Sequence, residues 1–162
     1  MVERRALSFQ TLDQVMPEVD RLLDGHATVG RWSLGQICNH LASVLACSVE
    51  GFPVAAPWLV RATTGALKRK RSLGTGVHVE GMRHPEGTGP KENLEARAEA
   101  EALRATLRYY ASHQAPLAPH ALLGPMSRAE WDRYHAIHCA HHLSFVLPKP
   151  ESPSPDAPRA GD

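Results

Sequence analysis

The sequence lacks a long apolar run, a signal peptide and a strong net charge. No stretch of roughly 18 apolar residues, the length that suggests a membrane span, occurs, and the longest apolar run, 52–60, contains Pro53 and Pro57. The start, MVERRALSFQTLDQV, has no apolar core of the kind that signal peptides carry. The formal net charge of +1 gives no overall attraction to nucleic acid or to anionic membranes.

Cysteine is also scarce, and its pattern excludes a disulfide scaffold. The three cysteines, Cys38, Cys47 and Cys139, are an odd number and show no CxxC spacing, which fits a reducing compartment. Hydrophobic residues make up 43% of the chain and charged residues 22%, as in ordinary globular proteins. We therefore expect one cytoplasmic domain, whose compositional anomaly is its ten histidines.

Two helix starts carry complete capping boxes. Ser33 is followed three residues later by Gln36, and Ser127 by Glu130, so each pair can satisfy the first backbone amides of a helix. Gly51 would end the first helix, and Pro148 the second. The predicted helices are 34–50 and 128–147.

Two further helices and one long connection complete the predicted fold. Thr11 and Gln14 could cap a helix to Asp24, and residues 92–110 are rich in helix formers, with Pro90 suited to the first turn. The connection 51–89 contains a candidate short helix at 58–69 and a strand-like alternation at 76–80. Four helices with a long crossover between the second and the third predict an all-α four-helix bundle over residues 1–147.

The remaining residues, 148–162, contain five prolines and almost no apolar side chains. Such a composition cannot bury enough surface to fold by itself. We predict a disordered tail.

His138 and His142 form the most informative pair of residues. A spacing of four residues places both on one helix face, the apolar face that also holds Trp131 and Tyr134. Inward imidazoles need partners, and a metal ion would bind one nitrogen of each ring. His40 flanks the apolar stripe of helix 34–50 and is the third candidate ligand. The alternative is core packing beside a polar partner.

Three histidines with one open position form a known catalytic zinc arrangement, although nickel, iron or manganese could also bind. Several other kinds of active site are excluded by the residue spacing. The chain has no HExxH, Glu-x-x-His, GxSxG, P-loop or GxGxxG motif. Cys139 could be a fourth ligand, a nucleophile or a packing residue, and Tyr134 could assist proton transfer. Glu130 and Asp132 are close in sequence, but Asp132 faces away from the histidines. His135 also lies on the face of His138 and His142, one turn earlier. We assign no role to five further histidines: His26, His78, His84, His113 and His120.

The run Lys68–Arg71 is the strongest charge cluster. A solvated loop is the default interpretation, and a site for an anionic substrate or cofactor is the alternative. A nucleic-acid contact lacks the interleaved aromatic residues that usually support one.

The segments WSLGQICNHLASVLACSVEGFP and LLGPMSRAEWDRYHAIHCAHHLSFVLP resemble the DinB/YfiT-like superfamily of metalloenzymes, in a branch labelled as a domain of unknown function. The resemblance covers roughly residues 3–147. It implies a four-helix bundle with a long crossover, and a metal site that matches His40, His138 and His142. A shift of one residue would put His141 in place of His142, but the helical wheel favours His142.

Characterised members of that superfamily include bacillithiol transferases and mycothiol-dependent isomerases. The resemblance therefore implies a metal-dependent enzyme that joins a low-molecular-weight thiol to a small-molecule substrate. Metal-activated hydrolysis and a non-catalytic binding or stress protein are the alternatives, and a homodimer is a candidate assembly.

Overall fold

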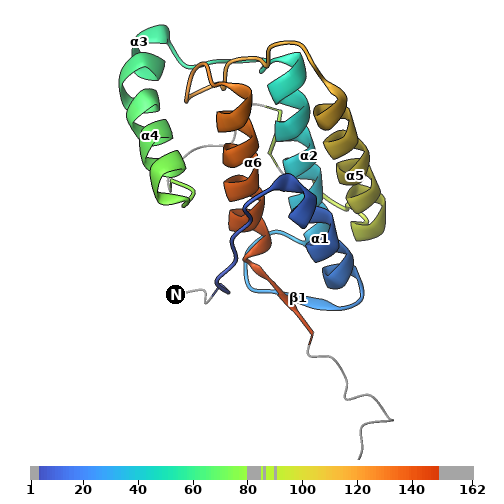
Figure 1. Cartoon of the computed structure of the whole chain (residues 1–162). Helices are drawn as coiled ribbons and strands as arrows, with labels where there is room; N and C mark the ends of the chain where they lie inside the picture. The colour runs from blue at the N-terminus through green and yellow to red at the C-terminus, as the bar shows by residue number, and fades with distance from the viewer. Residues whose placement is uncertain (1–3, 80–84, 86, 90, 150–162) are drawn as a thin grey trace, which may run out of the picture.

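The computed structural model describes residues 4–79, 85, 87–89 and 91–149, and helices make up most of this part of the chain. Four helices lie side by side, and a further helical segment packs against the last of them on the opposite side (Figure 1). The four are α1 (Val15–Leu23), α2 (Leu34–Glu50), α5 (Ala96–Ser112) and α6 (Arg128–Leu143). None of the described helices is long and apolar enough to cross a membrane.

Helices α2 and α6 begin at the predicted capping boxes. The Gln36 amide donates to Ser33 Oγ at 3.2 Å, and the Ser33 amide donates to Gln36 Oε1 at 2.9 Å. Ser127 and Glu130 make the same reciprocal pair of hydrogen bonds at the start of α6. Because these bonds fix where each helix starts, they also fix which way the histidines on α2 and α6 face.

The first predicted helix forms as η1 (Leu12–Gln14), a 3-10 turn that runs directly into α1. Gln14 Oε1 accepts a hydrogen bond from the Thr11 amide at 3.2 Å. Pro17 lies in the first turn of α1, where a missing amide hydrogen removes no helical hydrogen bond.

The third predicted helix, 92–110, begins four residues later than expected. It begins at Ala96, after Glu95 accepts a hydrogen bond from the Ala98 amide at 2.8 Å. Pro90, the expected first-turn proline, lies outside the described residues. Ala100 and Leu103 of α5 are fully buried with residues of α1, α2 and α6, so this helix closes one side of the core.

The predicted end of the last helix, Leu147, is wrong. Helix α6 ends at Leu143, and β2 (Val146–Pro148) pairs antiparallel with β1 (His26–Thr28). Ser144 Oγ donates to the His141 carbonyl at 2.6 Å, and the Val29 amide donates to the Phe145 carbonyl at 2.9 Å. These bonds replace a further helical turn with strand pairing.

The long connection contains more helix than expected and no strand in its described part. Helices α3 (Trp58–Val60), η2 (Arg61–Gly65, a π-helical turn) and α4 (Ala66–Thr75) form one continuous segment. Gly76 ends it in the left-handed conformation with φ of 68°, so the predicted strand at 76–80 does not form over 76–79. Glu80 and the predicted tail beyond Lys149 lie outside the described residues.

Gly65 allows this segment to pack closely against the chain before α6. A Cβ atom at Gly65 would lie 2.0 Å from the Leu122 carbonyl oxygen, which no other residue type can accommodate without movement. Arg69 also donates a hydrogen bond to the Pro125 carbonyl. Together these contacts fix α4 beside α6.

Candidate metal centre

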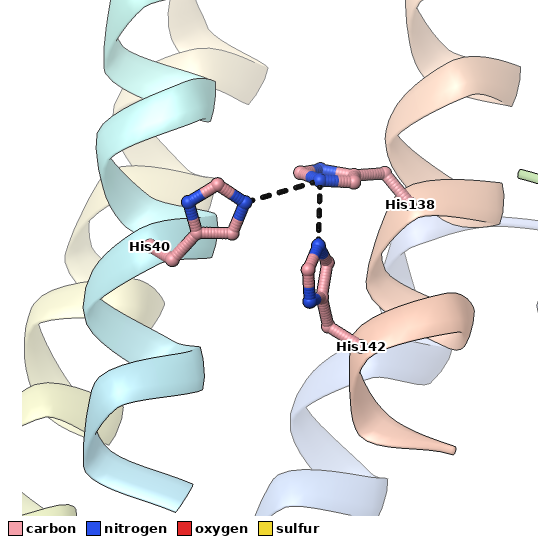
Figure 2. Close-up of side chains that lie close together, drawn as sticks. All are labelled: His40, His138 and His142. Atoms are coloured by element: carbon pink, nitrogen blue, oxygen red, sulfur yellow. Dashed lines mark hydrogen bonds between the residues drawn. The ribbon is translucent and has the colours of Figure 1, made fainter. Parts of the chain in front are cut away.

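Three imidazole rings converge between α2 and α6. Figure 2 shows His40 reaching from α2 toward His138 and His142 of α6. His138 Nε2 lies 3.2 Å from His40 Nε2 and 3.0 Å from His142 Nε2. One nitrogen of each ring lies within 4.8 Å of the others. Nitrogens bound about 2.1 Å from a shared ion lie roughly 3 to 4 Å apart, so three such nitrogens could hold one metal ion.

The orientation of His40 is set by a backbone carbonyl. His40 Nδ1 lies 2.5 Å from the Thr88 carbonyl oxygen, which can only accept a hydrogen bond. The Nδ1 atom therefore carries a proton, and in the neutral ring the Nε2 lone pair faces the cluster. A metal-binding histidine usually donates its other ring N–H to a carbonyl or carboxylate oxygen in this way.

The protonation of His138 also suits metal binding. Its side chain is buried, and burial, with the nearby His142 and His40 rings, holds its pKa well below 6.5. The neutral His138 ring has at most one proton on Nε2. It can therefore donate a hydrogen bond to only one of the two neighbouring Nε2 atoms. A metal ion would satisfy all three lone pairs at once.

A cavity of about 390 Å³ opens beside His142. Trp32, just before α2, stacks on the His142 ring with centroids 5.2 Å apart and planes 1° apart. The indole also meets the His40 ring edge at 5.1 Å. The cavity is mostly apolar, so a small molecule could approach the cluster here. Its lining comprises Val29, Gly30, Arg31, Trp32, Ile37, His141, His142 and Phe145.

His78 lies over the other side of the cluster. The turn at Gly76 brings its ring to centroid distances of 5.2 Å from His138 and 4.5 Å from His141. Burial and the neighbouring positive groups lower the pKa of His78 to about 3, so the ring is neutral. Its Nδ1 atom is buried and has no hydrogen-bond partner among the described residues.

Tyr134 lies one turn before His138, and the two rings stack with planes 14° apart. His120 Nδ1 accepts hydrogen bonds from the amides of Leu122 and Leu123, at 3.0 and 3.1 Å. In the neutral ring, His120 Nε2 must therefore donate to Tyr134 Oη, 3.2 Å away. Burial lowers the pKa of His120 to about 4, so this tautomer persists at neutral pH.

The other residues considered from the sequence lie elsewhere. Cys139 packs in the main core, where burial raises its pKa to about 12. Asp132 accepts a hydrogen bond from the Tyr110 hydroxyl at 2.7 Å, and Glu130 caps α6. His141 Nδ1 lies 2.9 Å from Arg4 Nη1 and is not one of the three converging rings.

We assign no role to His78 and His120 from the sequence, yet His78 adjoins the cluster and His120 lies beside Tyr134. Neither lies on α6, the helix that carries His138, so no spacing argument could have placed them. The signal available was the αL-prone Gly76 two residues before His78. His84, which also received no role, lies outside the described residues.

A family model described as "Protein of unknown function (DUF1569)" matches residues 1–149. Since the match covers most of the chain, the chain belongs to this family. No curated protein and no solved structure matches the chain.

Proposed function

We propose that this member of the DUF1569 family binds one divalent metal ion through His40, His138 and His142 and acts as a metal-dependent enzyme. The convergence of three Nε2 atoms carries the proposal. Zinc, nickel, iron and manganese all accept imidazole ligands. Three protein ligands would leave a coordination position for a substrate, as in catalytic rather than structural zinc sites.

The proposed architecture is a four-helix bundle of the DinB/YfiT-like kind. Helices α1, α2, α5 and α6 would form it, and the segment 51–95 would be its crossover. The side-by-side packing of these helices supports this assignment (Figure 1).

The proposed reaction transfers the sulfur of a low-molecular-weight thiol to an electrophilic small molecule. The new S–C bond forms as the leaving group departs with its electrons, and the thiol proton passes to solvent. A bound divalent ion would lower the pKa of a thiol or a water molecule at the open position. The chain itself orients His40 through Thr88 and covers the rings with Trp32. The apolar cavity beside His142 suits a hydrocarbon-rich electrophile.

His78 supports metal-activated hydrolysis as a second candidate. Its neutral ring adjoins the cluster, and its buried Nδ1 atom makes no hydrogen bond to the described residues. A group of this kind could take a proton from an attacking water molecule.

Product formation by the metal-loaded protein tests and separates these reactions. One assay combines a small thiol with monobromobimane and follows thioether fluorescence, and the other follows hydrolysis of 4-nitrophenyl acetate. We expect thioether formation above the rate of the free thiol, and a loss of about 100-fold or more in His138→Ala. Ester hydrolysis alone would favour the second reaction. Neither activity, with the metal bound, would favour a non-catalytic metal-binding protein.

A further inference from the structure

A second cavity, of about 420 Å³, lies at the end of α4. It is formed where the chain leaves the helix and turns at Gly76 toward α6. Its lining comprises Arg71, Thr75, Val77, His78 and Val79. The cavity thus combines one guanidinium group, one hydroxyl, one imidazole and two apolar walls.

His78 joins this cavity to the candidate metal centre. The same ring that lines the cavity lies 5.2 Å from the His138 ring and 6.2 Å from the His142 ring, measured between centroids. It also lies 4.5 Å from His141, which lines the apolar cavity. The two cavities therefore adjoin across the pair His78–His141, and a ligand anchored at the cluster could extend past His78.

The surroundings of this second cavity are cationic. No acidic side chain is among its described lining residues. Arg4 also acts on His78 as a nearby positive charge. The whole segment 51–79 contains five basic residues and no acidic residue. An anion placed here would be attracted by Arg71 and the neighbouring basic residues.

Arg71 is the member of the basic run available to such an anion. Arg69 is engaged with the Pro125 carbonyl, whereas the guanidinium group of Arg71 makes no hydrogen bond or ion pair with the described residues. Lys70, its neighbour, is exposed and does not line the cavity. A planar guanidinium binds a carboxylate or another oxoanion through two parallel hydrogen bonds.

We propose that Arg71 and the cavity beside His78 bind the acidic group of the substrate. The substrate class is then an organic acid, in which a short apolar chain joins a carboxylate or similar oxoanion to the group that reacts at the metal. Val77 and Val79 would contact the apolar chain. This inference rests on the proposed function, because the reacting end of the substrate must reach the three histidines.

Two hydroxamic acids of equal chain length test the inference. Succinic monohydroxamic acid carries a carboxylate where butyrohydroxamic acid carries a methyl group, and the hydroxamate of each binds divalent metals. Dissociation constants are measured for the cobalt(II)-loaded protein from its visible spectrum. The variant is Arg71→Gln, and Lys70→Gln is the matched control with the same loss of charge in the same helix.

We expect the parent and Lys70→Gln to bind the succinic compound about 10-fold more tightly than the butyric one, the magnitude of a hydrogen bond to a charged group. In Arg71→Gln, this preference should fall below about 3-fold, with butyrohydroxamic acid bound as before. Equal affinities in the parent, or an equal loss of preference in Lys70→Gln, would overturn the anion site alone. Failure of cobalt or of both hydroxamates to bind would overturn the proposed function and this inference with it.

Discussion

At the scale of single residues, the Thr88 carbonyl sets the orientation and the tautomer of His40. Its hydrogen bond with His40 Nδ1 leaves the Nε2 lone pair directed at His138 and His142. Rotation of the His40 ring would break this bond, so the ring is held ready before an ion arrives. Preorganisation of this kind separates a metal site from histidines that merely share a core.

The first prediction separates the two neighbouring histidines of α6. We expect His142→Ala to weaken zinc binding by about 100-fold or more, because a direct ligand contributes more than an outer-shell partner does. His141→Ala should change it by less than about 5-fold, since His141 is not among the converging rings. Competition with a fluorescent zinc chelator measures both. The reverse order would place His141 in the site.

The second prediction concerns pH and His120. Its pKa is lowered to about 4 in the folded state, whereas in the unfolded chain it stays near 6.5. Above pH 6.5 both states are neutral, so stability is unaffected; as pH falls toward 4, only the unfolded state gains the proton, and the folded state loses relative stability. The loss attributable to His120 reaches about 3 kcal/mol.

Urea denaturation of the metal-free protein at pH 7 and pH 4 measures this effect. Between these two pH values, His120→Gln should lose about 3 kcal/mol less than the parent, because glutamine does not titrate. An identical pH dependence in the two proteins would mean that His120 does not remain neutral in the folded state.

The sequence predicted the converging histidines but not their neighbours. His138 and His142 share a face because they share a helix, and a period suffices to pair them. His78 reaches the cluster, and His120 reaches Tyr134, from irregular segments whose paths depend on tertiary contacts such as those of Gly65 and Arg69. No local sequence pattern encodes such a path, so the positions of these two histidines could be learned only from the three-dimensional structure.

At the scale of elements, the close contact of Gly65 with Leu122 positions α4, and α4 carries Arg71 and leads to His78. The third prediction is that Gly65→Ala destabilises the protein by about 1 to 3 kcal/mol, because the added methyl group overlaps the Leu122 carbonyl. Gly74→Ala is the control in the same segment, since nothing lies within 4 Å of its Cβ position.

Gly74→Ala should be neutral or stabilising by up to about 1 kcal/mol, because alanine is the better helix former. Thermal unfolding followed by circular dichroism measures both variants. Equal stability of Gly65→Ala and the parent would contradict the close packing of α4 against the chain before α6.

Local signals accounted for the beginnings of elements better than for their ends. The capping boxes at Ser33 and Ser127 predicted where α2 and α6 start, because the hydrogen bonds involved span three residues. The end of α6 depends instead on pairing between Val146–Pro148 and His26–Thr28. That pairing joins opposite ends of the sequence, and Val146 fits either a helix face or a strand.

At the scale of the whole molecule, a bound ion would connect α2 to α6 and so stabilise the arrangement of the core helices. A ligand that binds only the folded state at about 1,000 times its dissociation constant adds roughly 4 kcal/mol. The fourth prediction is that saturating zinc raises the melting temperature by about 10 °C. His40→Ala should abolish this rise, whereas His113→Ala, a change outside the cluster, should leave it intact.

The central claim is that three imidazole rings share one ion. X-ray absorption spectroscopy of the zinc-loaded protein tests it most directly, because the scattering pattern counts imidazole ligands. We predict one zinc ion per chain with three histidine nitrogens at about 2.0 to 2.1 Å. A stoichiometry well below one, or a spectrum with fewer than three imidazoles in the parent protein, would contradict the account.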